Sequence, residues 1–414
     1  MVATEKRPRL GRDFTRLWLA TAISSIGDGV TIAAAPLLAT RLTDDPRLIG
    51  ATSVAFTLPF VLFGLPAGML VDRLDIRRTI VLIDYVRAVV LAVLTAAVLG
   101  GWGGLPLLYV AMFVLGTGDV FCRNAEQVLV PFIAEKPVLA TANARIMGVQ
   151  EAGAGFVGPL LGALLFGAAA ALPFGVDAVS FVVSATLVAG IRGVRTSAAA
   201  GAGEPPAAGM WAEMIAGARW LWRHSLLRGL ALLSCLINLA GNAMLAVLVI
   251  HSTKVLHLSS FGFGVVLACQ AAGAVLASRV APALHRRLGR EGALIATALL
   301  LVGSETVLAA VPSPYAAGLA LALFACGTVT WNVVVVVLRQ TLVPQHLLGR
   351  VNGVYRLISW GGLPIGAAAG GFGAAYAGTR SVFGAGAVVM AGIAVVLVVG
   401  ARRQWISRAD PQAQ

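Results

Sequence analysis

Charged residues are scarce in this chain. They account for 12% of the 414 residues, whereas hydrophobic residues account for 58%. About a quarter of a typical soluble chain is charged, because charged side chains cover its surface. Half of that share cannot cover a globule of this size, so the composition excludes an ordinary soluble fold.

The sequence also lacks the motifs that carry common enzyme chemistry. It contains no Walker loop, no HExxH or CxxC pattern and no nucleophile elbow. Its four cysteines fall inside apolar runs, far apart and without metal spacing, so we expect them to be small buried hydrophobic residues. We therefore predict that the chain is not an enzyme and needs no metal or other cofactor.

Long apolar runs dominate what is present. About 20 apolar residues cross a bilayer as a helix, and only helices and closed barrels satisfy their backbone groups in lipid. The runs are continuous rather than alternating, which favours helices. We predict an all-α membrane protein with twelve transmembrane helices, at roughly 15–40, 48–71, 79–100, 106–130, 141–166, 171–191, 228–250, 261–281, 292–311, 315–338, 351–374 and 381–400.

One connection is longer than the others and divides the spans six to six. Residues 192–227 begin with a linker rich in alanine, glycine and proline, and continue with apolar residues at helical spacing. We predict an N-terminal six-helix bundle over 1–191, a cytoplasmic linker with an amphipathic helix over 192–227, and a C-terminal six-helix bundle over 228–414.

Basic residues indicate the orientation. If the N-terminus is inside, most of the 31 Lys and Arg residues lie on inner segments, as the positive-inside rule requires. Both termini are therefore predicted to be cytoplasmic, and the net charge of +13 reflects topology rather than a nucleic-acid partner. Arginine far outnumbers lysine and alanine and glycine are abundant, which is typical of a GC-rich bacterium. We expect a multi-pass protein of the bacterial plasma (inner) membrane.

The two halves repeat one another. The sequence Gln-Val-Leu-Val-Pro ends the fourth span at Pro131 and Asn143 opens the fifth, while Gln-Thr-Leu-Val-Pro ends the tenth at Pro344 and Asn352 opens the eleventh. This spacing predicts two pseudo-symmetric, parallel six-helix repeats. In such a fold the substrate site lies between the halves, near the membrane midplane.

The inner loop after the second span resembles a signature of the major facilitator superfamily. The superfamily pattern is matched at Gly68, Leu70, Asp72, Arg73 and Arg77. Asp75 replaces the usual glycine, and an acidic residue there is similar to the drug:proton antiporter branch that holds macrolide and siderophore exporters. The resemblance implies a cytoplasmic gate motif formed by Gly68, Asp72, Arg73, Arg77 and Arg78.

The fifth span carries a second resemblance. Gly158, Pro159 and Gly162 look like the antiporter signature of this superfamily, although Ala154 and Ala163 replace two of its glycines. The signature is associated with exporters. Proline removes a backbone donor and glycine thins the helix, so we expect a bendable, closely packed segment.

Charges on the fourth span extend the predicted gate. Asp119, Arg123 and Glu126 are four and three residues apart and share one helical face. We expect them to form a gate network in which Glu126 reaches Arg73 or Arg77. On the third span, Asp84 and Arg87 are three apart and are expected to pair with each other.

Two carboxyl groups lie in the middle of apolar spans, Asp28 in the first and Glu151 in the fifth. A charge at bilayer depth costs at least ~2.5–3.5 kcal/mol, so each is a functional candidate. The superfamily resemblance implies that spans one, four and five face the central cavity. We therefore predict Asp28 and Glu151 as proton-coupling residues, with a structural carboxyl group as the alternative for each.

The second half contains few charges. Its candidates for the cargo cavity are polar, aromatic or basic residues: Asn238, Asn242, Gln270, Trp331, Asn332 and Arg356. A cavity with acids on one side and an apolar, aromatic wall on the other suits amphiphilic or cationic cargo.

The sequence therefore predicts a secondary active transporter, a proton-coupled exporter of small hydrophobic or amphiphilic organic compounds that works by alternating access. The proton gradient supplies the energy, and the partners are the cargo, protons and membrane lipids. We expect a monomer. A lipid or lysolipid flippase and a proton-coupled importer of a small metabolite are the alternatives.

Overall fold

The computed structural model describes residues 10–71, 74–134, 138–191 and 210–402 of the chain. Within these residues the protein is almost entirely helical and has no β-strand, which confirms the predicted all-α class. The chain divides into two compact units, Met1–Ala35 with Leu62–Gly203 and Pro36–Val61 with Glu204–Gln414. The second unit thus includes residues 36–61, which belong to the predicted N-terminal bundle in sequence.

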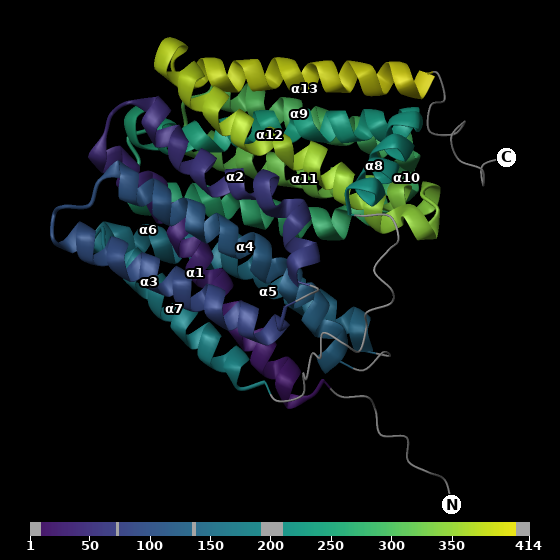
Figure 1. Ribbon diagram of the computed structural model, residues 1–414. Coiled ribbons are helices and arrows are strands. Elements are labelled where there is room, and N and C mark those ends of the chain that lie inside the picture. The colour runs from purple at the N-terminus through teal and green to yellow at the C-terminus, as the bar shows by residue number, and fades with distance from the viewer. Residues whose placement is uncertain (1–9, 72–73, 135–137, 192–209, 403–414) are drawn as a thin grey trace, which may run out of the picture. The chain divides into compact units, whose positions relative to one another are not determined.

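The first unit contains most of α1, the end of α2, and the helices up to α7. Here α3 packs against α4 and α7, and α3 and α7 run side by side (Figure 1). The elements are α1 (Arg12–Leu42), α2 (Pro46–Val71), α3 (Ile76–Leu99), α4 (Leu105–Ile133), α5 (Leu139–Ala152), the π-helical turn η2 (Gly153–Val157), α6 (Gly158–Ala168) and α7 (Leu172–Ala189).

The second unit contains the remaining helices. In it α9 packs against α12 and α13, and α10 packs against α11 and α13 (Figure 1). The elements are α8 (Met210–Arg223), α9 (Ser225–Ile250), the π-helical turn η3 (His251–Val255), α10 (Ser260–Ala310), α11 (Pro314–Leu342), the 3-10 turn η4 (Gln345–Leu347), α12 (Leu348–Ala377) and α13 (Thr379–Arg402).

The helices account for the predicted spans. In the described part of the chain, 11 helical segments are long and apolar enough to cross a membrane. Two of these lie in α10, which bends sharply at Gly289, where φ is 69° and only glycine is unstrained. The remaining predicted span, at 351–374, lies within α12, a 30-residue helix whose many glycines lower its hydropathy.

The fifth predicted span is interrupted by a π-helical turn. Residues Gly153–Val157 form this turn between α5 and α6, directly before Pro159. Proline cannot donate the backbone hydrogen bond of a regular helix, and π-turns absorb such a defect. The bendable segment expected from the sequence is therefore a local widening of the helix.

Glycines bring the π-helical turn η2 and α6 against α1 backbone to backbone. A Cβ atom at Gly158 would lie 2.6 Å from the Cα of Gly29, and one at Gly162 would lie 2.9 Å from the Cα of Val30. Real Cβ atoms essentially never come so close, so these positions need glycine. The antiporter-like motif is thus the surface on which α1 lies.

The second unit repeats this packing at the corresponding helices. Gly362, Gly366 and Gly370 recur every four residues on α12 and lie against the backbone of α9 at Cys235, Leu239 and Ala243. The eleventh predicted span therefore lies on the seventh as the fifth lies on the first. The agreement supports the internal repeat read from the sequence.

The amphipathic helix predicted within 192–227 is α8, although residues 192–209 lie outside the described part. Leu221 is buried, whereas Ile215 and Trp222 are exposed. Gly217 lies against the backbone of Arg350, so α8 is packed on α12. Its exposed apolar side chains are suited to the membrane surface.

The structure gives Asp75, which replaces the usual glycine of the superfamily pattern, a local role. It is the N-cap of α3, and its carboxylate accepts a hydrogen bond from the backbone N–H of Arg78 at 3.0 Å. The pair Arg78 Nε–Asp75 Oδ2 is 3.5 Å apart. The acidic residue thus begins the helix that carries Asp84 and Arg87.

We expect Asp75→Ala to lower the free energy of unfolding by about 1 kcal/mol, because a lost N-cap leaves backbone N–H groups of α3 without a partner. Asp75→Asn keeps the acceptor and should be close to wild type. Thermal unfolding of the purified protein in detergent checks both variants. Equal destabilisation by Asn and Ala would show that the charge of Asp75, and not the cap, is what matters.

Candidate functional site

A polar pocket lies inside the first unit, where α1, α3, α4, α5 and α7 approach each other. Its cavity volume of about 20 Å³ is enough to hold a water molecule. The pocket is lined by Ser24, Ser25, Asp28, Ile80, Asp84, Arg87, Asp119, Cys122, Arg123, Glu126, Gln150 and Ser184. Most of the intramembrane charges of the first half therefore meet at one place.

Arg87 is the centre of this pocket, and its side chain is 3% exposed. Its Nη2 donates to Oδ1 of Asp28 at 3.2 Å and to the carbonyl oxygen of Leu115 at 3.2 Å. Its Cζ lies 4.3 Å from the ring centroid of Phe181. Gly118 leaves room for the arginine stem, which a Cβ atom there would strike. Four helices thus position one guanidinium group.

Asp84 is the second carboxyl group near Arg87. Its Oδ1 is 4.0 Å from Nη1 of Arg87, and its Oδ2 accepts a hydrogen bond from Ser184 at 2.7 Å. The expected local pair on α3 is therefore present but long. The closer partner of Arg87 is Asp28, on another helix.

On α4, Arg123 donates from Nε to both carboxylate oxygens of Asp119 at 2.8 Å. Glu126 accepts hydrogen bonds from Thr21 of α1 at 3.1 Å and from Gln150 of α5 at 2.8 Å. The face shared by Asp119, Arg123 and Glu126 thus points into the pocket.

The structure gives the predicted gate loop a different set of contacts. Asp72 and Arg73 lie outside the described residues, and Gly68 lies within α2. Arg77 donates to the carbonyl oxygen of Ile191 at 3.1 Å. The described contacts of Glu126 are with Thr21 and Gln150, so the expected contact between Glu126 and Arg77 is replaced by a link between α1, α4 and α5.

Asp177 on α7 belongs to the same region and was missed by the sequence analysis. Its side chain is 0% exposed, and it accepts hydrogen bonds from Thr31 of α1 at 2.5 Å and from Ser180 at 3.0 Å. Gly27 lies directly against it. The available signal was an aspartate inside the apolar run 171–191.

The charges of this region do not balance. Two guanidinium groups face five carboxyl groups, and several of the carboxyl groups have hydroxyl or amide donors as their close partners. An uncompensated buried charge is costly. The region is therefore suited to hold protons. The carboxyl groups are Asp28, Asp84, Asp119, Glu126 and Asp177, and the guanidinium groups are Arg87 and Arg123.

The two predicted proton-coupling residues have different surroundings. The Asp28 side chain is 15% exposed and bonded to Arg87, whereas Glu151 is exposed at the end of α5. Its neighbour Gln150 lines the pocket. Asp28 is thus built into the charge cluster, and Glu151 lies outside it with an exposed side chain.

In the second unit, two of the predicted cavity residues join α9 to α12. Asn238 donates to the backbone and side-chain oxygens of Ser359, both at 2.9 Å, and Asn242 donates to the carbonyl oxygen of Leu363 at 2.6 Å. Each amide has a donor engaged in helix packing, which the sequence does not reveal.

The other predicted cavity residues are spread over three helices. Trp331 is buried, and its indole N–H donates to Ser234 at 2.7 Å. Gln270 on α10 is half-buried and Asn332 on α11 is exposed. The guanidinium carbon of Arg356 lies 4.2 Å from the ring centroid of Trp360.

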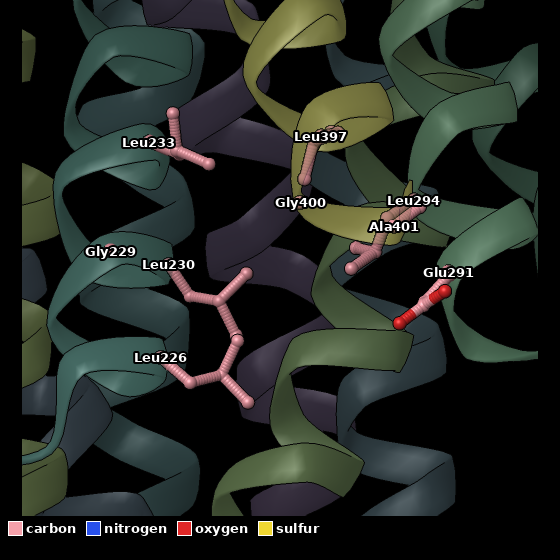
Figure 2. A pocket seen from close by; sticks show the side chains of 9 residues that line it. All are labelled: Leu226, Gly229, Leu230, Leu233, Glu291, Leu294, Leu397, Gly400 and Ala401. Atoms are coloured by element: carbon pink, nitrogen blue, oxygen red, sulfur yellow. The ribbon is translucent and has the colours of Figure 1, made fainter. Parts of the chain in front are cut away.

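A second pocket, apolar and also of about 20 Å³, lies in the second unit. Figure 2 shows leucines of α9 on one side, residues of α13 on the other, and Glu291 of α10 at the edge. Its leucine lining identifies it as a packing space. It is lined by Leu226, Gly229, Leu230, Leu233, Glu291, Leu294, Leu397, Gly400 and Ala401.

Comparison with known families decides the classification. The profile of the transmembrane secretion effector family matches residues 7–412. The chain belongs to this family of the major facilitator superfamily. Its members are transporters rather than enzymes, and the predicted superfamily and multi-pass location in a bacterial plasma membrane are confirmed.

Curated relatives of this transmembrane secretion effector cover almost the whole chain. The multidrug efflux pump Tap of Mycolicibacterium fortuitum is 26% identical over 400 residues, which cover 92% of this chain and 93% of Tap. The enterobactin exporter EntS of Salmonella typhi is 27% identical over 417 residues, which cover 95% of this chain and 93% of EntS.

Solved structures confirm the fold of this family member. The nucleoside transporter NupG matches with a TM-score of 0.73 at 11% identity, over 94% of this chain and 98% of NupG. A bacterial homologue of the iron transporter ferroportin matches with a TM-score of 0.69 at 18% identity, over 94% of this chain and 98% of the homologue. At these identities the likeness concerns the fold alone.

Proposed function

We propose that this transmembrane secretion effector is a proton-coupled exporter of small hydrophobic or amphiphilic organic compounds. Its efflux relatives Tap and EntS support export. The observation that carries proton coupling is the position of Arg87, which is 3.2 Å from Asp28 on α1 and 4.0 Å from Asp84 on α3. One cation therefore has two alternative anions on two helices.

This arrangement gives the proton a mechanical effect. While Asp28 is ionised, its ion pair with Arg87 holds α1 to α3. When Asp28 takes up a proton, its negative charge is lost and Arg87 keeps Asp84 as its anion. A buried pair is strong only while both charges are present. Protonation of Asp28 would therefore release α1.

The release of α1 would reach the antiporter-like motif. Helix α1 lies on the glycines of η2 and α6, with Gly29, next to Asp28, against the backbone of Ala154 in η2. A shift of α1 therefore acts directly on η2 and α6. The π-helical turn at Gly153–Val157 is the point at which this segment can bend.

A path for the proton is part of the proposal. Water in the pocket would connect Asp28, Asp84, Asp119 and Glu126, which all line it. Glu151 on the exposed face of α5 would exchange protons with the aqueous cavity. The proton gradient is the energy source, and we propose both termini on the cytoplasmic side, where the loop after α2 acts as a gate.

The decisive experiment replaces Asp28 with asparagine. In everted vesicles with an acidified interior, we expect Asp28→Asn to abolish uphill accumulation of cargo, because residue 28 no longer exchanges a proton. Counterflow exchange, which needs no gradient, should persist. The cargo probes are a matched set of naphthalene derivatives: naphthoate, naphthalenemethanol and naphthylmethylammonium.

Asp13→Asn is the matched control for this variant. Asp13 lies in the first turn of the same helix, outside the pocket, and forms an ion pair with Arg16 at 3.2 Å. This variant should keep full uphill accumulation. Undiminished accumulation by Asp28→Asn, with the protein folded, would refute the assignment of Asp28.

A further inference from the structure

This inference rests on the proposed function and concerns the chemistry of the cargo. Along α11, Asn332, Val336 and Arg339 recur at spacings of four and three, so they share one helical face. Asn332 and Val336 are exposed and Arg339 is half-buried. A polar side chain in the middle of a span faces a water-filled cavity rather than lipid. This face of α11 is therefore directed towards water rather than lipid.

Arg339 on this face of α11 is held by an aromatic ring. Its Cζ lies 4.1 Å from the ring centroid of Tyr355, and its buried Nε has no hydrogen-bond partner among the described residues. Tyr355 is itself fixed, because its hydroxyl group lies 2.7 Å from Oγ of Ser234 and donates to the carbonyl oxygen of Leu230 at 3.0 Å. The guanidinium group is thus positioned while donor capacity is left over.

Among the described residues, no carboxylate forms an ion pair with Arg339. The sequences of α9, α11 and α12 contain no aspartate or glutamate. The two glutamates of α10, which also packs on α11, lie elsewhere: Glu305 is buried without a hydrogen-bond partner in the described part of the chain, and Glu291 lines the apolar pocket. The first unit is the opposite case, with five carboxyl groups around two arginines. The charge that would complement Arg339 is therefore expected to come from a ligand.

A second stacked arginine follows on α12. Arg356 is the next residue after Tyr355, and its Cζ lies 4.2 Å from the ring centroid of Trp360. The ring of Trp360 in turn meets Phe60 edge-on at a centroid distance of 5.5 Å. The second unit thus combines two ring-stacked guanidinium groups with the half-buried rings of Trp360 and Phe60.

Planar anions fit this combination. A guanidinium group over a ring keeps N–H groups at its edge, and these match the two oxygens of a carboxylate. The half-buried rings of Trp360 and Phe60 supply contact area for an aromatic or apolar body. We propose that Arg339 and Arg356 form a subsite in the second unit for the carboxylate, or another planar oxyanion, of an amphiphilic cargo. The cargo class is then an organic acid, not the cation that the sequence left open.

The test compares three probes that share one ring system and differ in charge. Binding of naphthoate, naphthalenemethanol and naphthylmethylammonium to the purified full-length protein is measured by titration calorimetry in detergent. No proton gradient is present, so the result does not depend on coupling. Wild-type protein should bind naphthoate about tenfold or more tightly than naphthalenemethanol, since a hydrogen bond to a charged group is worth at least about one decade in affinity.

Variants of Arg339 locate the effect. Arg339→Gln should weaken naphthoate binding about tenfold or more and leave the neutral probe unchanged. Arg339→Lys keeps the charge without the planar fork, so it should lie between wild type and Arg339→Gln; it also serves if Arg339→Gln does not fold. Arg380→Gln, an exposed arginine of α13, is the matched control and should bind all three probes as wild type does.

Several outcomes would overturn the proposal. They are equal binding of the three probes by wild type, tightest binding of the ammonium probe, no binding of naphthoate, and equal loss of all probes in both Arg339 variants. Proton-coupled export is tested separately from the subsite. Arg339-dependent naphthoate binding without uphill accumulation in vesicles would leave the subsite intact and refute proton-coupled export.

Discussion

Arg87→Met is expected to lower the free energy of unfolding by about 3–5 kcal/mol, the usual effect of removing one partner of a buried ion pair. Methionine fills the space of the arginine stem and carries no charge. Asp28 and Asp84 would then lose the cation that lies 3.2 and 4.0 Å from them. Unfolding of the purified protein by denaturant in detergent measures the loss.

A double variant shows whether charge is the cause. Adding Asp28→Asn to Arg87→Met removes the stranded carboxylate, so part of the lost stability should return. Arg380→Met, at an exposed arginine of α13, should change stability little. If Arg87→Met alone unfolds as wild type does, Asp28 and Asp84 are both neutral in the folded protein, and the ion-pair mechanism fails.

The expected effect on transport differs from that of Asp28→Asn. With Arg87 absent, Asp28 no longer ties α1 to α3 in either protonation state. We therefore expect proton movement and cargo movement to become uncoupled, and uphill accumulation in everted vesicles to be lost in the folded part of the preparation. Retained uphill accumulation would place the coupling anion elsewhere, with Glu151 the next candidate.

The fold follows from sequence because bilayer thickness fixes span length, and lipid forbids unpaired backbone groups. Composition and run length therefore predict the helices and the all-α class. The bend in α10 depends on one glycine with positive φ, Gly289, within an otherwise continuous helix. The glycine motif of the fifth span is also visible in sequence, although its neighbour α1 is not.

The site is less predictable, because its bonds join residues far apart in the chain. Local spacing pairs Arg87 with Asp84, but tertiary packing brings Asp28, 59 residues away, closer to it. Asp177 belongs to no local motif, and the hydroxyl group that donates to it, that of Thr31, is 146 residues away in the chain. Sequence reasoning thus finds most of the charges that lie in the predicted spans, and the structure shows what they contact.

Gly158→Ala is expected to destabilise the first unit by about 1–3 kcal/mol or more, as overpacking of a close helix contact does. The new Cβ would lie 2.6 Å from the Cα of Gly29 and 2.6 Å from the carbonyl oxygen of Ile26. Both atoms are backbone and cannot rotate away, so α6 must shift from α1. Thermal unfolding in detergent and uphill accumulation in vesicles should both fall.

Gly366→Ala in α12 should have a similar effect in the second unit, because its Cβ would lie 2.9 Å from the Cα of Leu239. Matched controls exist on the same helices: nothing lies within 4 Å of a Cβ at Gly167 on α6 or at Gly361 on α12. Since alanine favours a helix by up to about 1 kcal/mol over glycine, these two variants should be neutral or stabilising. If all four substitutions behave alike, helix propensity governs these positions, and the glycines do not act as the contact between the repeated helix pairs.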